Sequence, residues 1–274
     1  MHERDVAGLA LPLLARTVCR RHFSLGADGL LVVGNSNDGL KLQMFNPDGT
    51  EDFCGNGLRC AALYAKTLGW IGSESVISHH GRQVLVKIGR DDLVETEIGS
   101  ASFAPPSIPL APGCAELFEA DLDLGKETIK VSSLSTGSAH TVIFVESLPN
   151  DLSFFRLGPL IEDHPWFPEK TSAIWTQVLS PRKLRLRIWE RGAGETLGCG
   201  TGAAAAAAAH FRREGLGGEV EVANPGGSLL IRMEGWDKPI TVIGMAQVVY
   251  RGVLPLKQML GSQKQLSTGA SGSD

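Results

Sequence analysis

An internal repeat is the feature that most constrains how this chain can fold. The motif Cys-Gly-x-Gly occurs at Cys54 and again at Cys199, 145 residues later, and both copies run directly into a helix-like segment. The same offset places residues 42–45 on 187–190, a short strand-like run ahead of each motif. A glycine-rich tetrapeptide can recur by chance, but shared flanking strands are harder to explain in that way.

The repeat continues beyond the two motifs into a pair of hairpins. Residues 76–88 align with 221–233 as strand, turn and strand, with Gly81 over Gly226. One offset therefore aligns a strand, a cysteine motif, a helix and a hairpin in the same order. We expect two similar halves that face each other across a pseudo-twofold axis.

Strand-like runs greatly outnumber helix-like runs along the chain. Alternating and β-branched runs recur between turn signals such as Asn-Pro-Asp-Gly and Asn-Pro-Gly-Gly. Helices are expected at only four places, about 10–22, 55–69, 154–163 and 200–214. This balance predicts an α+β fold with large sheets rather than a doubly wound parallel fold.

The repeat also sets the expected domain boundaries. The pattern breaks at the proline-containing stretch SASFAPPSIPLAPG, near 98–106. We expect an N-terminal half of 1–98 that is completed by a closing strand from about 246–258, and a C-terminal half of 99–245. Residues 259–274 are mostly small and polar, which is typical of a disordered tail.

Composition excludes several classes of protein. The 274 residues carry a net charge of −4, which gives no sign of a nucleic-acid or anionic-membrane partner. No apolar run is long enough to span a bilayer. The five cysteines are odd in number and scattered, without zinc-like spacing, so neither a disulfide framework nor a metal site is expected. These features favour a cytoplasmic protein with free thiols.

The position of each motif cysteine predicts reactivity. Each begins a predicted helix, where unpaired backbone N–H groups and the positive end of the helix dipole gather. We expect this setting to lower the pKa of both thiols. The same N–H groups can hold a carboxylate, and glycines at 55, 57, 200 and 202 would let that anion reach the backbone.

Two such cysteines suit the inversion of a stereocentre. A thiolate on one side of a carbon can remove its proton while a thiol on the other side delivers one, and no cofactor is needed. The bound carboxylate becomes enolate-like, and the helix N–H groups stabilise the charge that develops. Buried structural thiols are the plainer alternative. A thiol hydrolase would not explain the duplication, and a nucleotide-binding loop lacks its βαβ context.

The two motifs resemble those of a known family. DGTEDFCGNGLRCAA and WERGAGETLGCGTGAAAA are similar to the cysteine motifs of the diaminopimelate epimerases, which are cofactor-independent amino-acid epimerases. ARTVCRRHFSLGADGLLVV, NPGG and GMAQVVYRG extend the resemblance over roughly 15–255. It implies two pseudo-symmetric domains, each a curled, mostly antiparallel sheet around a central helix, with the active site in the cleft between them. It also implies a homodimer.

The resemblance implies roles for individual residues. Cys54 and Cys199 are the two acid/base thiols. His140 and Glu190 lie near the thiols and support them. The substrate contacts implied by the family pattern are Asn46, Gly55, Asn56, Glu190, Arg191, Gly200 and Thr201.

The sequence departs from the family pattern at three places. The family opens with a strand carrying His-Gly-x-Gly-Asn-Asp, whereas this chain starts at MHERDVAGLALPLLAR. The family's Gly-Asn-Pro-His is replaced by a sequence with Ser138 before His140, and a later asparagine is replaced by Ser172. In the family both asparagines bind the far end of the substrate, so the chemistry end is retained and the specificity end is changed.

Three functions therefore stand as hypotheses. The first is epimerisation of LL- and meso-diaminopimelate, a step toward lysine and peptidoglycan precursors, and Arg191 favours it by retaining a charge for a distal carboxylate. The second is the same two-thiol chemistry on another small amino acid. The third is a catalytically degenerate protein that only binds an amino acid.

Overall fold

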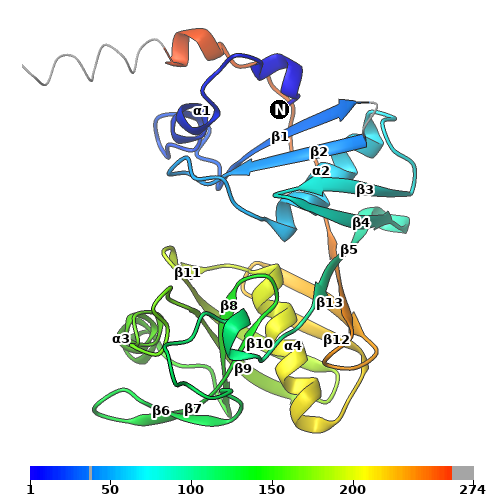
Figure 1. The fold of residues 1–274 in the computed structure, drawn as a ribbon. Coiled ribbons are helices and arrows are strands. Elements are labelled where there is room, and N and C mark those ends of the chain that lie inside the picture. The colour runs from blue at the N-terminus through cyan, green and yellow to red at the C-terminus, as the bar shows by residue number, and fades with distance from the viewer. Residues whose placement is uncertain (37–38, 261–274) are drawn as a thin grey trace, which may run out of the picture. The chain divides into compact units, whose positions relative to one another are not determined.

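The structure divides the chain into two compact units. It is a computed structural model that describes residues 1–36 and 39–260. One unit is formed by Met1–Val94 together with the chain from Met245 onward, and the other by Glu95–Gly244 (Figure 1). The chain first leaves the N-terminal unit within strand β5 (Leu93–Ser100). The two units are described separately below.

The N-terminal unit is built on a mixed sheet. Its strands lie in the order β1-β2-β3-β4, with bounds Leu30–Ser36, Gly39–Phe45, Glu74–His79 and Arg82–Ile88. The pairs β1–β2 and β3–β4 are antiparallel, whereas β2 and β3 run parallel. Helix α2 (Gly55–Thr67) makes the connection that this parallel pair requires.

Side chains alternate across β1 and so give the sheet two apolar faces. Val33 packs with the buried face of α2, whereas Leu30 and Val32 pack with α1 (Leu11–Val18) and the short 3-10 helix η1 (Glu3–Val6). The sheet is thus covered by a helix on each side (Figure 1).

The C-terminal unit contains a larger sheet. Its strands lie in the order β5-β14-β13-β12-β10-β9-β8-β7-β6, and the short β11 pairs with β10. The pairs β8–β9 and β10–β12 are parallel. The remaining bounds are β6 (Ala120–Asp123), β7 (Thr128–Ser135), β8 (Ala139–Val145), β9 (Ser172–Ser180), β10 (Lys183–Glu190), β11 (Gly194–Thr196), β12 (Gly218–Asn224), β13 (Gly227–Met233) and β14 (Pro239–Met245).

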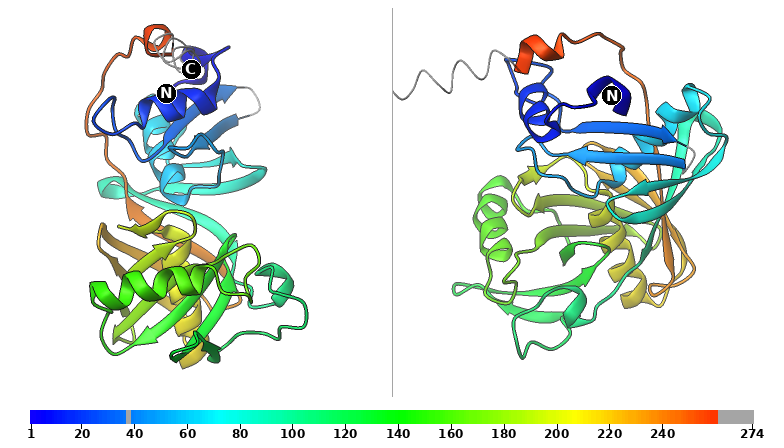
Figure 2. Two further views of the ribbon diagram at one scale, coloured as in Figure 1. Left: turned by 90° about the vertical axis from the view of Figure 1, so that its left-hand side faces the viewer. Right: turned by 45° about the horizontal axis from the view of Figure 1, so that its top comes forward.

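The alanine run forms the central helix of this unit. All seven alanines of α4 (Gly200–Glu214), from Ala203 to Ala209, are fully buried, and strands from β5 to β14 contribute side chains around them. Because methyl side chains take little room, the sheet can curl closely around the helix. Helix α3 (Asp151–Glu162) covers the opposite face, against Ala173 and Trp175 (Figures 1 and 2).

The repeat predicted from the sequence is present in the strand pairing. β1-β2-α2-β3-β4 and β9-β10-α4-β12-β13 share one order of antiparallel, parallel and antiparallel pairs. The predicted α+β class is confirmed, and four of the described helices overlap the four expected ranges. Two further short 3-10 helices are η2 (Arg90–Asp92) and η3 (Pro105–Ser107).

The expected closing strand at 246–258 is wrong for this structure. β14 is the last strand described, residues 246–255 have no regular structure, and 256–260 are helical. Val249 and Val253 are 85% and 97% exposed, so their β-forming side chains have no neighbouring sheet to pack on. Within the expected tail, Met259 and Leu260 pack against the core beside α1, and 261–274 lie outside the described residues.

The first residues of the chain pair alongside β1. The Val33 N–H donates to the Met1 carbonyl at 2.9 Å, and His2 forms a parallel bridge with Val33. The amino group of Met1 donates to the Leu31 carbonyl at 2.7 Å. In the second unit the corresponding strand β9 instead pairs in parallel along the length of β8.

Candidate active site

The two cysteine motifs fold in the same way at the start of a helix. Cys54 and Cys199 are the N-cap residues of α2 and α4, both with extended backbone. The Gly57 N–H donates to the Cys54 sulfur at 3.2 Å, and the Gly202 N–H donates to the Cys199 sulfur at 3.4 Å. The placement predicted from the sequence is therefore confirmed, and each sulfur meets the positive end of a helix.

The second glycine of each motif is required for close packing. A Cβ atom at Gly57 would lie 2.8 Å from the Leu31 side chain, and one at Gly202 would lie 2.9 Å from the Ile174 side chain. Any larger residue would push the first helical turn away from the neighbouring strand. At Gly55 a Cβ atom would meet nothing within 4 Å, so the backbone there is open to a ligand.

The expected lowering of the thiol pKa values is wrong. Burial raises the pKa of Cys54, and the N–H groups of Gly57 and Asn56 together with the Arg59 charge offset only part of that effect. Burial also raises the pKa of Cys199, and the Glu190 carboxylate raises it further. In both places the loss of solvent outweighs the helix N-terminus, which sequence reasoning could not weigh.

A histidine that the sequence did not single out holds the Cys54 backbone. The Cys54 N–H donates to Nε2 of His79 at 3.0 Å, and Nδ1 of His79 lies 3.0 Å from the Leu42 carbonyl. Because Nε2 accepts, Nδ1 carries the proton and donates to that carbonyl. His79 is 1% exposed, and burial lowers its pKa, which favours this neutral form.

A buried arginine orients the second residue of α2. Arg59 is 5% exposed, and its guanidinium donates to Oδ1 of Asn56 at 2.5 Å and to the Gly55 carbonyl at 3.4 Å. This contact fixes the Asn56 amide by its oxygen and leaves its N–H₂ group to donate elsewhere. A charged residue inside the apolar stretch LRCAAL was the available sequence signal for Arg59.

Asn46 lies in the turn that follows β2. Its backbone N–H donates to the Thr50 carbonyl at 2.8 Å, and its side-chain amide donates to the Thr50 hydroxyl at 3.1 Å. Asp48 closes the same turn by accepting from the Thr50 N–H and hydroxyl. The structure thus groups Asn46, Cys54, Gly55 and Asn56 in the N-terminal unit and holds Asn46 by local bonds.

In the C-terminal unit a carboxylate lies beside the thiol. Glu190, at the end of β10, accepts a hydrogen bond from Cys199. The Thr201 hydroxyl lies 3.4 Å from the Cys199 sulfur, and the Thr201 carbonyl accepts from Thr136 at 3.0 Å. Glu190 and Thr201 thus both lie beside the Cys199 thiol.

His140 belongs to a second polar group in this unit. It is 1% exposed, and its Nε2 lies 3.0 Å from the Ser138 hydroxyl. Burial, with a smaller contribution from the Arg191 charge, lowers the pKa of His140 to about 3, so the ring is neutral at pH 7. In the register of β8 and β9, His140 lies opposite Ser172.

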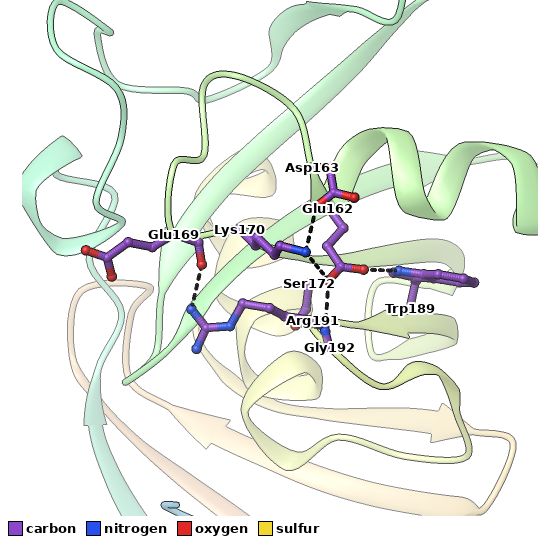
Figure 3. A network of polar contacts seen from close by, with 8 residues as sticks. All are labelled: Glu162, Asp163, Glu169, Lys170, Ser172, Trp189, Arg191 and Gly192. Carbon is purple, nitrogen blue, oxygen red and sulfur yellow. Dashed lines mark hydrogen bonds and ion pairs between the residues drawn. The ribbon is translucent and has the colours of Figure 1, made fainter. Parts of the chain in front are cut away.

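Ser172 is hydrogen-bonded to the backbone of Arg191. The Arg191 N–H donates to the Ser172 hydroxyl at 3.1 Å, and the Arg191 guanidinium donates to the Glu169 carbonyl at 3.0 Å (Figure 3). The two serines that replace family asparagines therefore have protein partners, His140 for Ser138 and Arg191 for Ser172.

Metal-binding clusters and membrane-spanning helices are both absent from the described residues. No three His, Cys, Asp or Glu side chains there are placed to hold a metal ion. No helix in that part of the chain is long and apolar enough to cross a membrane. All five cysteines are free thiols.

The fold is shared with several solved structures of low sequence identity. A phenazine biosynthesis protein of the PhzF family from Bacillus anthracis superposes with a TM-score of 0.64 at 16% identity, covering 92% of this chain and 91% of that chain. A probable proline racemase from Agrobacterium radiobacter has a TM-score of 0.61 at 13% identity, with coverages of 89% and 83%. At these identities the likeness concerns the fold alone.

Sequence comparisons are more specific. The model of the family described as diaminopimelate epimerase matches residues 3–104 and 132–250. A diaminopimelate epimerase from Moorella thermoacetica is 37% identical over 253 residues, which cover 90% of each chain. A second, from Pelotomaculum thermopropionicum, is 37% identical over 254 residues with the same coverage. The chain therefore belongs to the diaminopimelate epimerase family.

Proposed function

We propose that this protein is a cofactor-independent epimerase that interconverts LL- and meso-diaminopimelate. The observation that carries the proposal is the pair of cysteine N-caps, each with its sulfur on the first N–H groups of a helix. Membership of the diaminopimelate epimerase family gives the substrate class. We also propose that it acts as a homodimer in the cytoplasm and supplies precursors of lysine and peptidoglycan.

The reaction needs both thiols at one α-carbon, one on each face. Cys54 as thiolate takes the α-proton, so that an S–H bond forms as the C–H bond breaks. Cys199 as thiol then gives its proton to the opposite face and becomes the thiolate, and the total charge is conserved. The N–H groups of Gly55, Asn56, Gly200 and Thr201 hold the substrate carboxylate and stabilise the enolate-like charge.

Neighbouring charges support this division of roles. The Arg59 charge lowers the pKa of Cys54 against the effect of burial, whereas Glu190 accepts from the Cys199 thiol and keeps it protonated. We therefore assign Cys54 as the thiol that loses its proton more readily and Cys199 as the thiol that stays protonated. His140 is neutral beside Ser138 and adds no competing positive charge.

The distal half of the substrate is assigned to the region around Arg191. Its guanidinium offers a charge for the second carboxylate, and among the described residues it donates to the Glu169 carbonyl. Asn46 and Glu190 complete the polar contacts of this proposed site. Ser138 and Ser172 border it but already have protein partners.

Deuterium incorporation tests the proposal directly. The protein is incubated with LL- or meso-diaminopimelate in deuterated water, and α-deuterium is followed by mass spectrometry. We expect incorporation together with epimerisation, and loss of both in Cys54→Ala and Cys199→Ala. Absence of exchange with any amino acid would contradict the proposal and favour a protein that only binds its ligand.

One observation favours a second candidate. Ser138 and Ser172 are bonded within the protein, so neither offers the amide donor that the family uses for the distal end of diaminopimelate. The same two-thiol chemistry could then act on an amino acid without that distal group. A panel of amino acids in the deuterium experiment separates the two, because exchange into another amino acid alone supports the second candidate.

A further inference from the structure

A buried carboxylate lies behind the residues assigned to substrate. Glu162, the last residue of α3, is 7% exposed. Its Oε2 accepts from the Trp189 indole N–H at 2.7 Å, and its Oε1 accepts from the Gly192 backbone N–H at 2.8 Å (Figure 3). These two donors are the residues immediately before and after Glu190-Arg191, so one carboxylate holds both ends of that pair.

The sequence of α3 makes this contact possible. Gly158 and Glu162 are four residues apart and lie on one face of the helix. A Cβ atom at Gly158 would lie 2.5 Å from the Trp189 ring, so glycine there leaves room for the indole to lie against the helix. The indole N–H then meets the carboxylate one turn further along.

The remaining contacts of the network hold the same turn from other directions. Lys170 lies 2.8 Å from the Asp163 carboxylate and 3.7 Å from that of Glu162, which supplies a positive charge for the buried group. Ser172 accepts from the Arg191 N–H at 3.1 Å. The segment from Trp189 to Gly192 is thus held at three groups, the Trp189 indole and the backbone N–H groups of Arg191 and Gly192.

We propose that Glu162 is a positioning residue that fixes the Glu190–Arg191 turn for substrate. It contacts neither the thiols nor the substrate itself but acts through Glu190 and Arg191, to which the proposed function gives those contacts. Glu190 contacts the Cys199 thiol, and the Arg191 guanidinium, bonded to the Glu169 carbonyl, is the group assigned above to the distal carboxylate. This assignment rests on the proposed function for its catalytic consequence, although the holding of the turn can be measured without turnover.

Glu162→Gln is the variant that tests the proposal. The indole and the Gly192 N–H reach different oxygens of Glu162, and a carboxamide turns one of these into an N–H₂ group, so one of the two donors would face another donor. We expect the KM for diaminopimelate to rise about tenfold and kcat/KM to fall about 100-fold, because displacement of the turn misplaces both substrate contacts. Trp189→Phe keeps the ring against Gly158 and removes only one donor, and should give a smaller change in the same direction.

The matched control is Glu127→Gln. Glu127 is a more exposed glutamate that pairs with Arg156 of α3. Its substitution should leave KM within about twofold of the wild type. Hydrogen exchange of the peptide containing Arg191 and Gly192 supplies the readout that does not need turnover. In Glu162→Gln these amides should exchange about tenfold faster.

The two readouts separate the possible failures. A wild-type protein without any exchange of substrate protons would overturn the proposed function, while faster amide exchange in Glu162→Gln would still support the positioning role. Unchanged amide exchange, or a lower kcat with unchanged KM that follows the loss of folded protein, would overturn the positioning role and leave a structural one.

Discussion

The two cysteines share a backbone setting but differ in the charge beside them. Cys54 and Cys199 are both N-caps, and each sulfur accepts a hydrogen bond from the backbone N–H three residues later in the chain. Beside Cys54 the charged neighbour is the buried Arg59, whereas beside Cys199 it is Glu190. Duplication thus supplies two thiols in one backbone setting, and the charged groups beside them differ in sign.

This difference explains how two thiols in the same backbone setting can fill two unlike roles in one reaction. A base and an acid are both needed at the start of each turnover, so two identical thiols would leave their protonation states undecided. An arginine on one side and a carboxylate on the other favour one assignment. The glycines at 57 and 202 belong to the shared backbone and carry no such distinction.

The largest effect is expected from removal of either thiol. Cys54→Ala and Cys199→Ala should each lower the rate of epimerisation by about 1,000-fold or more, since each removes one of the two proton-transfer groups. Chiral chromatography of the product checks this. Cys19→Ala changes a buried thiol outside both motifs and serves as the control. Near-normal epimerisation by one of the two motif variants would contradict the two-thiol account.

A second prediction compares the buried histidines of the two units. The pKa of His140 is about 3 when folded against about 6.5 when unfolded, so the unfolded chain binds the proton more tightly in this range. Its stabilising contribution is complete above pH 6.5 and is lost as the pH falls toward 3, by about 1.4 kcal/mol per pH unit at most. Denaturant unfolding between pH 4 and 7 measures this change.

His140→Gln should flatten that pH dependence within the C-terminal unit. His79→Gln should flatten it less, because burial lowers the pKa of His79 by a smaller amount. A wild-type slope that neither substitution alters would show that other groups govern acid unfolding.

Substitution of the charged neighbours should move the two thiols in opposite directions. Arg59→Met removes a charge that lowers the pKa of Cys54 and should slow its alkylation about three- to tenfold at pH 8. Glu190→Gln removes a charge that raises the pKa of Cys199 and should speed its alkylation by a similar factor. Peptide mass spectrometry follows both cysteines in one sample, so each is the reference for the other.

Arg59→Lys is the matched variant because it keeps the charge. It should preserve more of the Cys54 reactivity than Arg59→Met, although it loses part of the contact with Asn56. Equal slowing in both Arg59 variants would mean that packing, and not charge, sets the reactivity of Cys54.

The smallest expected effect concerns the turn at Asn46. Thr50→Val removes the hydroxyl that accepts from the Asn46 amide and donates to Asp48, so that Asn46 is held less firmly. We expect a two- to fivefold rise in KM at about the same kcat, since one neutral hydrogen bond contributes about 1 kcal/mol. A change in kcat of comparable size would place Thr50 closer to the chemistry than its turn position indicates.

Much of the fold could be predicted because its signals are local. The cysteine N-caps, the alanine helix and the hairpins each follow from residues within one short segment, and the offset of 145 residues connects them. Helix α4 begins and ends where the pattern places it, with Gly215 in the left-handed conformation at its end. The expected strand at 246–258 failed because a strand also needs a neighbouring strand, which no local pattern reveals.

The parts of the site that were missed depend on distant partners or on burial. Glu162 meets Gly192 across 30 residues, and His79 meets Cys54 across 25, so neither contact has a local signature. The thiol pKa was expected to fall because the helix terminus can be seen in the sequence. The loss of solvent around the sulfur cannot be seen in the sequence, and it has the larger effect on the pKa of both thiols.

The pH dependence of alkylation at the two motif cysteines tests the central claim most directly. Both thiols should react faster as the pH rises from 6 to 11, because burial raises both pKa values. The account predicts that Cys54 reaches its half-maximal rate at a lower pH than Cys199, since Arg59 favours one thiolate and Glu190 opposes the other. Coincident profiles, or a Cys199 profile at the lower pH, would contradict the assignment of base and acid.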